Sequence, residues 1–102
     1  MGYTIPHMSA ILLFHRKNIE SNGDIVEMKI WKVPHTKSRP EGLKHSLVYI
    51  KEGKRIIGYD NGEGKGHHRH YRDKEEVYAF KSIDSLIKDF YNDVASIRRG
   101  EA

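Results

Sequence analysis

Residues 22–33 read NGDIVEMKIWKV, from Asn22 to Val33, and predict the centre of a β-sheet. From Ile25 to Val33 apolar and charged residues alternate, which is the pattern of a strand with one buried face. The apolar set on that face is Val26, Met28 and Ile30. Asn22-Gly23-Asp24 is a turn signal, because glycine adopts positive φ without steric cost. The short apolar run Ala10–Lys17 then completes a hairpin, and we expect it to be buried on both faces for most of its length.

The sheet is expected to continue after a loop. Pro34–Gly42 predicts that loop, because its two prolines cannot donate to a strand ladder. Leu43–Ile50 and Arg55–Tyr59 predict two further strands around the tight turn Glu52-Gly53-Lys54. Val77–Lys81 is a candidate for a short fifth strand. All of these connections are local, so the sheet is expected to be an antiparallel meander.

The C-terminal part predicts a helix. Ser82 is a good N-cap, and Asp84 in the first turn suits the helix dipole. The apolar residues recur at helical spacing: Ile83, Leu86, Ile87, Phe90, Val94 and Ile97. Arg98-Arg99-Gly100 is a typical helix end. The fold class is therefore α+β, with an antiparallel β-meander of four to five strands and a C-terminal helix packed on one face.

Length and composition limit the possible functions. The chain has 102 residues, which fits one domain, and we place it at residues 10–100. Residues 1–9 are interpreted as an N-terminal extension, with His7-Met8 as a cloning junction. The formal net charge of +4 favours an anionic partner. The absence of cysteine excludes a disulfide scaffold and a thiolate zinc site. No apolar run suits a membrane span or a signal peptide, so we expect a cytoplasmic protein.

The segment Tyr59–Tyr71 contains the residues best suited to chemistry. It has few aliphatic residues, and we expect Asp60–Asp73 to form no core element. Its alternating glycines allow a close backbone approach to a ligand, and they are Gly62, Gly64 and Gly66. If the chain is extended after them, His68 and His70 lie on one face of a strand. Arg69 then lies on the other face.

One interpretation of this segment is metal-independent cleavage of RNA. The reaction needs a base for the 2′-hydroxyl, an acid for the leaving oxygen and cations for the phosphate. His68 and His70 suit the two proton transfers, because histidine titrates near neutral pH. Lys65 and Arg69 are the candidate phosphate stabilisers, and Asp60 is the candidate orienting residue.

Two other interpretations stay open. His68 and His70 could share a metal ion, with Asp60 or His35 completing the ligand shell. Alternatively, the segment is a glycine-rich surface loop with solvated histidines and no chemistry. No nucleotide cofactor is expected, because Gly66 follows Lys65 where a P-loop has serine or threonine. The favoured interpretation includes neither a cofactor nor a metal.

Residues outside this segment favour simpler explanations. Trp31 and Tyr49 are of the type that stacks on bases in single-strand binders, although packing in the core or at an edge is the favoured interpretation. His45 is expected at the surface. Asp89 and Asp93 share a helical face at i, i+4 spacing, and we interpret that face as solvated.

Ordered blocks along the chain resemble the TumE toxin family. The first blocks are Glu27-Met28-Lys29-Ile30-Trp31 and Pro40-Glu41-Gly42-Leu43-Lys44. The next are Gly58-Tyr59-Asp60-Asn61, Gly64-Lys65-Gly66 and His68-Arg69-His70, followed by Leu86, Asp89-Phe90 and Asp93-Val94. The resemblance runs from about Ala10 to Arg99. One departure is His67, where we expect an acidic residue, and His68 and His70 therefore rank ahead of it.

The resemblance implies a toxin of a prokaryotic type II toxin–antitoxin system, silenced by a cognate antitoxin protein. Together with the histidine chemistry, it favours an endoribonuclease whose RNA substrate is free or ribosome-associated. A homodimer is compatible with an exposed sheet edge. The alternative from another class is a non-catalytic RNA- or protein-binding module of the same fold.

Overall fold

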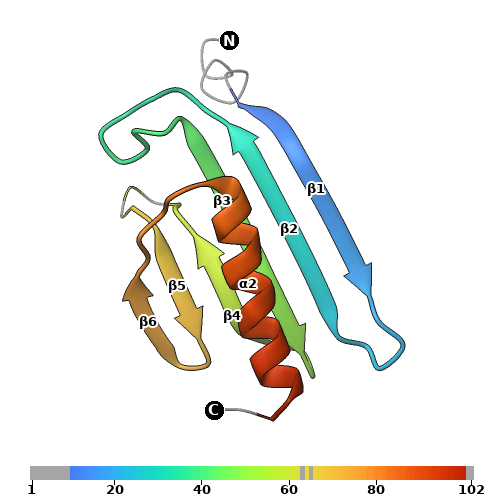
Figure 1. Cartoon of the computed structure of the whole chain (residues 1–102). Helices are drawn as coiled ribbons and strands as arrows, with labels where there is room; N and C mark the ends of the chain where they lie inside the picture. Colours follow the sequence, from blue (N-terminus) through green and yellow to red (C-terminus); the bar gives the residue numbers. More distant parts are fainter. Residues whose placement is uncertain (1–9, 63, 65, 101–102) are drawn as a thin grey trace.

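The computed structural model describes residues 10–62, 64 and 66–100 and shows an antiparallel sheet with one helix across it (Figure 1). Within these residues the sheet has six strands in the order β1-β2-β3-β4-β5-β6. The elements are β1 (Ile11–Ile19), β2 (Ile25–Lys32), β3 (Leu43–Lys51), β4 (Lys54–Asp60), β5 (His68–Tyr71), β6 (Lys74–Val77) and α2 (Ile83–Arg98). Each strand pairs with the next along the chain, so the predicted α+β meander is confirmed in class.

The predicted number of four to five strands is too low. β5 lies inside the Asp60–Asp73 segment that we expected to form no core element, and it pairs with both β4 and β6. The predicted strand Val77–Lys81 overlaps β6 only at Val77, and the residues after it are irregular. β5 forms because backbone ladders need no apolar side chain, and the edge of β4 supplies the donors and acceptors.

A tight turn and a β-bulge together set the register of β3 against β4. Glu52 and Gly53 both have positive φ, at 53° and 75°. Two consecutive left-handed residues are typical of the tight hairpin turn whose twist matches that of its strands. A β-bulge between Tyr49 and Ile50 then shifts the register by one residue, so that Leu47 lies opposite Tyr59, and both side chains face the helix in the core.

Helix α2 packs its apolar stripe on one face of the sheet. Ser82 caps its N-terminus, since the Ser85 amide donates to the Ser82 hydroxyl at 3.1 Å. The buried helical residues are Leu86, Phe90, Val94 and Ile97. They meet the alternating sheet residues Val26, Met28, Leu47, Tyr49, Ile57 and Tyr59. The alternation that predicted the β2 core face is therefore confirmed.

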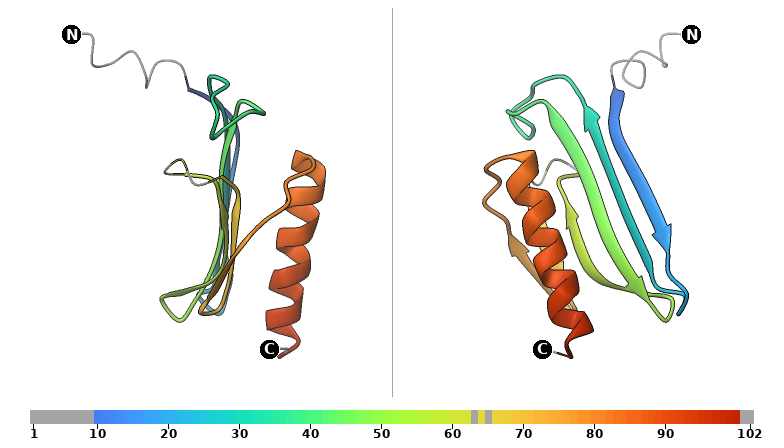
Figure 2. Two further views of the ribbon diagram at one scale, coloured as in Figure 1. Left: turned by 90° about the vertical axis from the view of Figure 1, so that its left-hand side faces the viewer. Right: turned by 45° about the vertical axis from the view of Figure 1, so that its right-hand side comes forward.

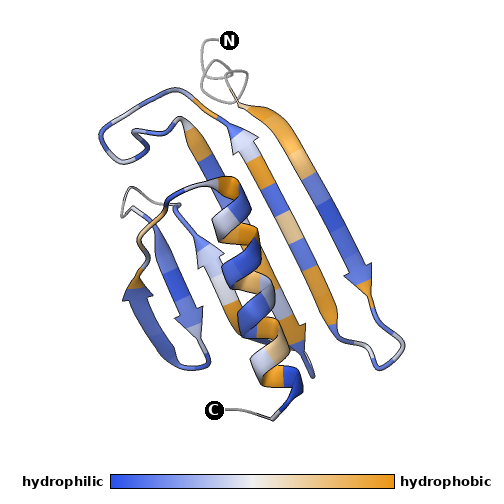
Figure 3. Cartoon of the chain, viewed as in Figure 1, coloured by the Kyte–Doolittle hydropathy of each residue, from blue (hydrophilic) through white to orange (hydrophobic). Residues whose placement is uncertain are grey.

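Strand β1 is not buried on both faces, contrary to expectation. It is one of the two edge strands of the sheet, and Ile11, Leu12 and Leu13 are each more than half exposed. Only Phe14 packs partly against the core. The hydropathy view shows this apolar segment at the sheet edge remote from β5 and β6 (Figure 3). The apolar residues of β1 stay exposed because α2 lies over the middle of the sheet.

The opposite face of the sheet carries no helix within the described residues, as the edge-on view shows (Figure 2). We call it the open face. Because strand residues alternate, Trp31, Lys44, Asp60, His68 and His70 lie on this face. No helix in the described part of the chain is long and apolar enough to span a membrane.

Candidate active site on the open face of the sheet

Strand β5 holds His68 and His70 between two flanking strands. His68 lies opposite Asp60 of β4, and His70 lies opposite Gly58 of β4 and Glu75 of β6. Both histidines face away from α2, while Arg69 between them faces the helix. This is the distribution that the alternation predicted.

A small histidine–carboxylate cluster results. The His70 Nε2 atom lies 3.4 Å from Asp60 Oδ2 and 3.9 Å from Glu75 Oε2. The His68 Nδ1 atom lies 3.6 Å from the same Glu75 oxygen. Each histidine side chain is 16% exposed, so the rings are largely screened yet reachable from solvent. Histidine is the side chain that enzymes use most often for general acid–base catalysis.

Glu75 is a site residue that sequence reasoning missed. It enters the cluster only through the β5–β6 hairpin, which the sequence analysis did not predict. The polar tight turn at Arg72 and Asp73 between two short segments was the available signal.

A shallow hollow of about 630 Å³ lies beside His70. Its lining residues are Lys54, Arg55, His70, Arg72, Asp73 and Glu75. Arg55 reaches across Gly58, where an added Cβ would stand 3.0 Å from Arg55 Cδ. A glycine at that position therefore lets the Arg55 side chain lie against the sheet next to His70. Its three cationic side chains can bind a phosphate, although the carboxylates of Asp73 and Glu75 line the same hollow.

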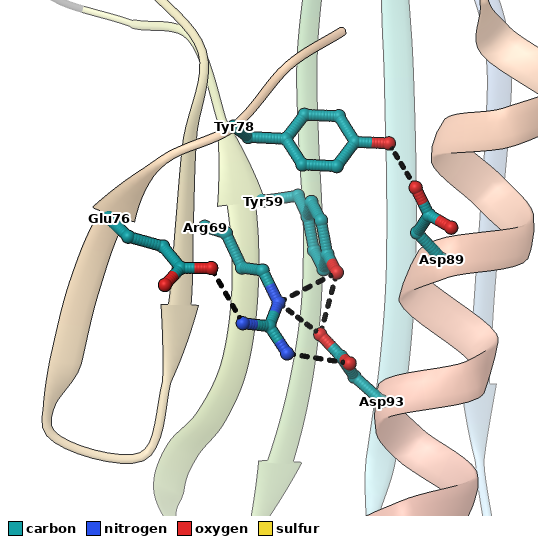
Figure 4. A network of polar contacts seen from close by, with 6 residues as sticks. All are labelled: Tyr59, Arg69, Glu76, Tyr78, Asp89 and Asp93. Carbon is teal, nitrogen blue, oxygen red and sulfur yellow. Dashed lines mark hydrogen bonds and ion pairs between the residues drawn. The ribbon is translucent and has the colours of Figure 1, made fainter. Parts of the chain in front are cut away.

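Arg69 is not brought together with the two histidines. On the helix side of the sheet, its Nε donates to Asp93 Oδ2 at 2.8 Å and its NH2 to Asp93 Oδ1 at 2.9 Å (Figure 4). Its NH1 donates to Glu76 at 2.8 Å. These hydrogen bonds, with Asp93 as the main partner, raise the pKa of Arg69. The guanidinium is held in the interface between sheet and helix.

Two tyrosines complete this interface. The Tyr59 hydroxyl donates to Asp93 at 2.6 Å, and the Tyr78 hydroxyl donates to Asp89 at 2.5 Å (Figure 4). Burial, and then the hydrogen bond to aspartate, raise the pKa of both phenols. The interpretation of Asp89 and Asp93 as a solvated face is therefore wrong. Their partners lie on strands and loops more than ten residues away in sequence, so no local signal revealed them.

A second histidine pair lies at the end of the core, on the helix side. The His45 Nε2 and His67 Nδ1 atoms are 2.9 Å apart, and His67 Nε2 lies 3.0 Å from Glu41 Oε2. The His67 ring stacks on Phe80 with 4.5 Å between centroids. Burial first, and then the nearby His67, lower the pKa of His45 to about 4. His45 is 1% exposed, so its expected surface position is wrong.

The described residues contain no group of three or more histidine and acidic side chains that could hold a metal ion. They therefore supply no ligand set for the metal interpretation. His35 contacts its own loop, with Nδ1 2.8 Å from the Pro40 carbonyl oxygen and the ring close to Gly42. Asp60 does lie near His70, as described above. The predicted phosphate stabiliser Lys65 and the extension at residues 1–9 lie outside the described residues.

The fold and site define a small α+β protein with a histidine–carboxylate cluster on an open antiparallel sheet. Comparison with protein families adds an identity to this description. The model of the family described as Toxin TumE matches residues 7–98, and the chain belongs to this toxin family. Comparisons with curated proteins and with solved structures gave no match.

Proposed function

We propose that this toxin cleaves RNA on the open face of the sheet and is silenced by a cognate antitoxin of a type II system. The observation that supports the proposal is the pairing of His68 and His70 on one strand, beside a hollow lined by three cationic and two acidic side chains. Histidine pairs can supply both the base and the acid for cleavage without a metal ion.

The proposed reaction transfers one proton at each end. One histidine removes the proton of the ribose 2′-hydroxyl, and the 2′-oxygen attacks the adjacent phosphorus. The bond from phosphorus to the 5′-oxygen breaks, and the second histidine gives that oxygen a proton. The products are a 2′,3′-cyclic phosphate and a 5′-hydroxyl, so no water is consumed. Asp60 and Glu75 orient the rings, and Arg55 with Lys54 stabilises the charge on the phosphorane.

This arrangement changes the proposed role of Arg69. Its guanidinium is held by Asp93 and Glu76 on the helix side, so we assign it a structural role and give the electrostatic role to Arg55 and Lys54. Lys65 stays a candidate phosphate stabiliser from the sequence.

The test combines cell toxicity with cleavage of mixed-sequence RNA by purified protein, in the presence of EDTA. His68→Ala and His70→Ala should each lower cleavage by about 10²-fold or more and relieve toxicity. His15→Ala is the matched control, because His15 is also a histidine on the open face, and it lies 2.8 Å from Glu27. It should leave both readouts unchanged.

Two outcomes contradict the proposal. Full toxicity in both histidine variants would remove His68 and His70 from the mechanism. Cleavage that stops with EDTA and returns with a divalent cation would favour the metal interpretation. Toxicity that depends on the histidines while free RNA stays intact would restrict the substrate to ribosome-associated RNA, and the assay is then repeated on translating ribosomes.

A further inference from the structure

A groove lies at the end of the sheet where β2 enters the loop of residues 33–42. It encloses about 590 Å³. Its apolar walls include Leu12, Val33 and Pro34 around Trp31, and two cationic side chains also line it, Arg39 and Lys44. Trp31 and Lys44 are cross-strand neighbours on the open face, the face that carries His68 and His70.

The Trp31 side chain is partly exposed and lines the groove. The Lys44 Nζ atom lies 5.2 Å from the centre of the ring. An ammonium group takes this position only over a ring face that is not packed against the protein. Cations are attracted to the electron-rich face of indole, and a nucleobase can use the same face for stacking. Lysine has a flexible stem, so Lys44 can move from the ring to a nearby phosphate.

Arg39 gives an independent indication of an anionic ligand. Among the described residues, its buried Nε–H meets no hydrogen-bond acceptor. A buried donor without a partner destabilises the folded protein, and a guanidinium group binds phosphate oxygens with good geometry. An aromatic ring face and an unsatisfied arginine in one groove match the two parts of a nucleotide.

We propose that this groove binds one nucleotide of a single-stranded RNA, with the base on Trp31 and its phosphate between Arg39 and Lys44. The proposal rests on the proposed function and adds a second subsite to it. Trp31 on β2 and His68 on β5 are three strand spacings apart, or roughly 14 Å across the sheet, and the register offsets them by roughly 7 Å along the strands. A short RNA segment laid across the strands can therefore reach both sites.

An acidic peptide is the rival ligand, because it would also pair with Arg39 and Lys44. RNA is favoured because a peptide carboxylate makes no use of the indole ring that lines the groove. The chain has one tryptophan, so its fluorescence reports on this groove alone. We would titrate the His70→Ala protein, in which the RNA stays intact, with an unstructured oligoribonucleotide. Parallel titrations would use an abasic sugar–phosphate oligomer and poly-glutamate.

The expected result is saturable quenching by the oligoribonucleotide and little change with the other two ligands. Equal responses to the abasic oligomer would overturn base stacking and leave only charge attraction. A response confined to poly-glutamate would overturn the RNA subsite in favour of an acidic protein partner. A flat titration with RNA would also reject the proposal.

Affinity measurements with labelled oligoribonucleotide complete the test. Trp31→Leu and Arg39→Gln should each weaken binding by about tenfold, and Trp31→Phe should weaken it less because a ring is kept. Tyr91→Leu is the matched control, since Tyr91 is an exposed aromatic residue on α2. Urea unfolding would verify that each variant is folded. Unchanged affinity in folded Trp31→Leu and Arg39→Gln proteins would reject the subsite.

This result can be separated from the outcome for the proposed function. RNA cleavage that continues normally in a Trp31→Leu protein with unchanged KM means that the groove proposal fails alone. Tryptophan quenching by RNA that no variant cleaves means that catalysis fails and the groove remains.

Discussion

At the scale of single residues, the Arg69–Asp93 pair joins the helix to the sheet. The Asp93 side chain is 13% exposed and receives two hydrogen bonds from one guanidinium. We expect Asp93→Ala to lower the free energy of unfolding by roughly 2–3 kcal/mol, because it leaves Arg69 and Tyr59 without their buried acceptor. Urea unfolding measures the change.

Glu76 gives the matched control for this prediction. It also accepts from Arg69, yet its side chain is 60% exposed. Exposed pairs contribute little, so Glu76→Ala should lower the free energy of unfolding by less than about 1 kcal/mol. Equal losses in the two variants would contradict the assignment of Asp93 as the buried anchor of α2.

The buried His45 should make stability depend on pH. Its pKa falls from 6.5 to about 4 on folding, so between these values the unfolded chain binds the extra proton. The free energy of unfolding is therefore expected to fall as the pH drops from 6.5 toward 4, by up to about 3 kcal/mol. His67 disfavours the charge on His45, whereas Asp60 and Glu41 favour it. Urea unfolding at several pH values measures this slope.

Replacing the His45 ring isolates the contribution of His45 to the pH dependence of stability. His45→Phe keeps an aromatic ring beside Phe80 and removes the titration, so the slope below pH 6.5 should become smaller. Asn92→Ala should retain the parent slope, because Asn92 is exposed on α2 and carries no titratable group. A His45→Phe protein with the parent slope would assign the pH dependence to other groups.

The sequence could predict only part of the site at this scale. The common face of His68 and His70 follows from strand alternation, which needs no knowledge of neighbouring strands. The pairing of Arg69 with Asp93 spans 24 residues and depends on where α2 crosses the sheet. Glu75 likewise required the β5–β6 pairing. Contacts set by the tertiary arrangement have no local signature.

At the scale of elements, the start of helix α2 depends on its cap. Ser82 has extended backbone angles and its hydroxyl accepts the Ser85 amide. We expect Ser82→Ala to lower the free energy of unfolding by about 1 kcal/mol, because a helix N–H loses its acceptor. Ser85→Ala is the control, since it keeps the amide that donates to Ser82 and should change stability by less than about 0.5 kcal/mol. Equal effects in thermal or urea unfolding would contradict the cap.

The elements also show where hydropathy patterns fail. β2 and α2 were predicted well because each has a strong period that matches one buried face. β1 is apolar at its start, yet it occupies the sheet edge beyond the reach of the single helix. β5 is polar, yet it pairs on both sides through its backbone. Composition alone therefore predicts a burial of β1 that the structure does not have, and it does not predict β5.

At the scale of the whole molecule, helix α2 covers one face of the sheet and leaves the other face open, and the two faces have different roles. The covered face holds the core and the Arg69–Asp93 network, which together fix the sheet. The open face presents both the histidine cluster and the Trp31 groove, on different strands and at different positions along them. Stability and the proposed chemistry thus depend on largely separate sets of side chains. Substitutions on the open face should accordingly leave the fold intact.

This division predicts which charges control RNA binding. Each phosphate neutralised on single-stranded RNA contributes about −0.7 to the slope of log affinity against log salt. In an uncleaving His70→Ala background, Arg55→Gln on the open face should reduce that slope by about 0.7. Lys88→Gln removes the same charge from the exposed surface of α2 and should leave the slope unchanged.

Fluorescence anisotropy of a labelled oligoribonucleotide at several salt concentrations measures both slopes. The two variants have the same net charge, so a difference between them reports the position of the charge and excludes a general loss of attraction. Equal reductions would mean that RNA is held by the overall positive charge of +4. A reduction confined to Lys88→Gln would place RNA on the helix side, where Arg69 is already held by carboxylates, and would remove the open face from the mechanism.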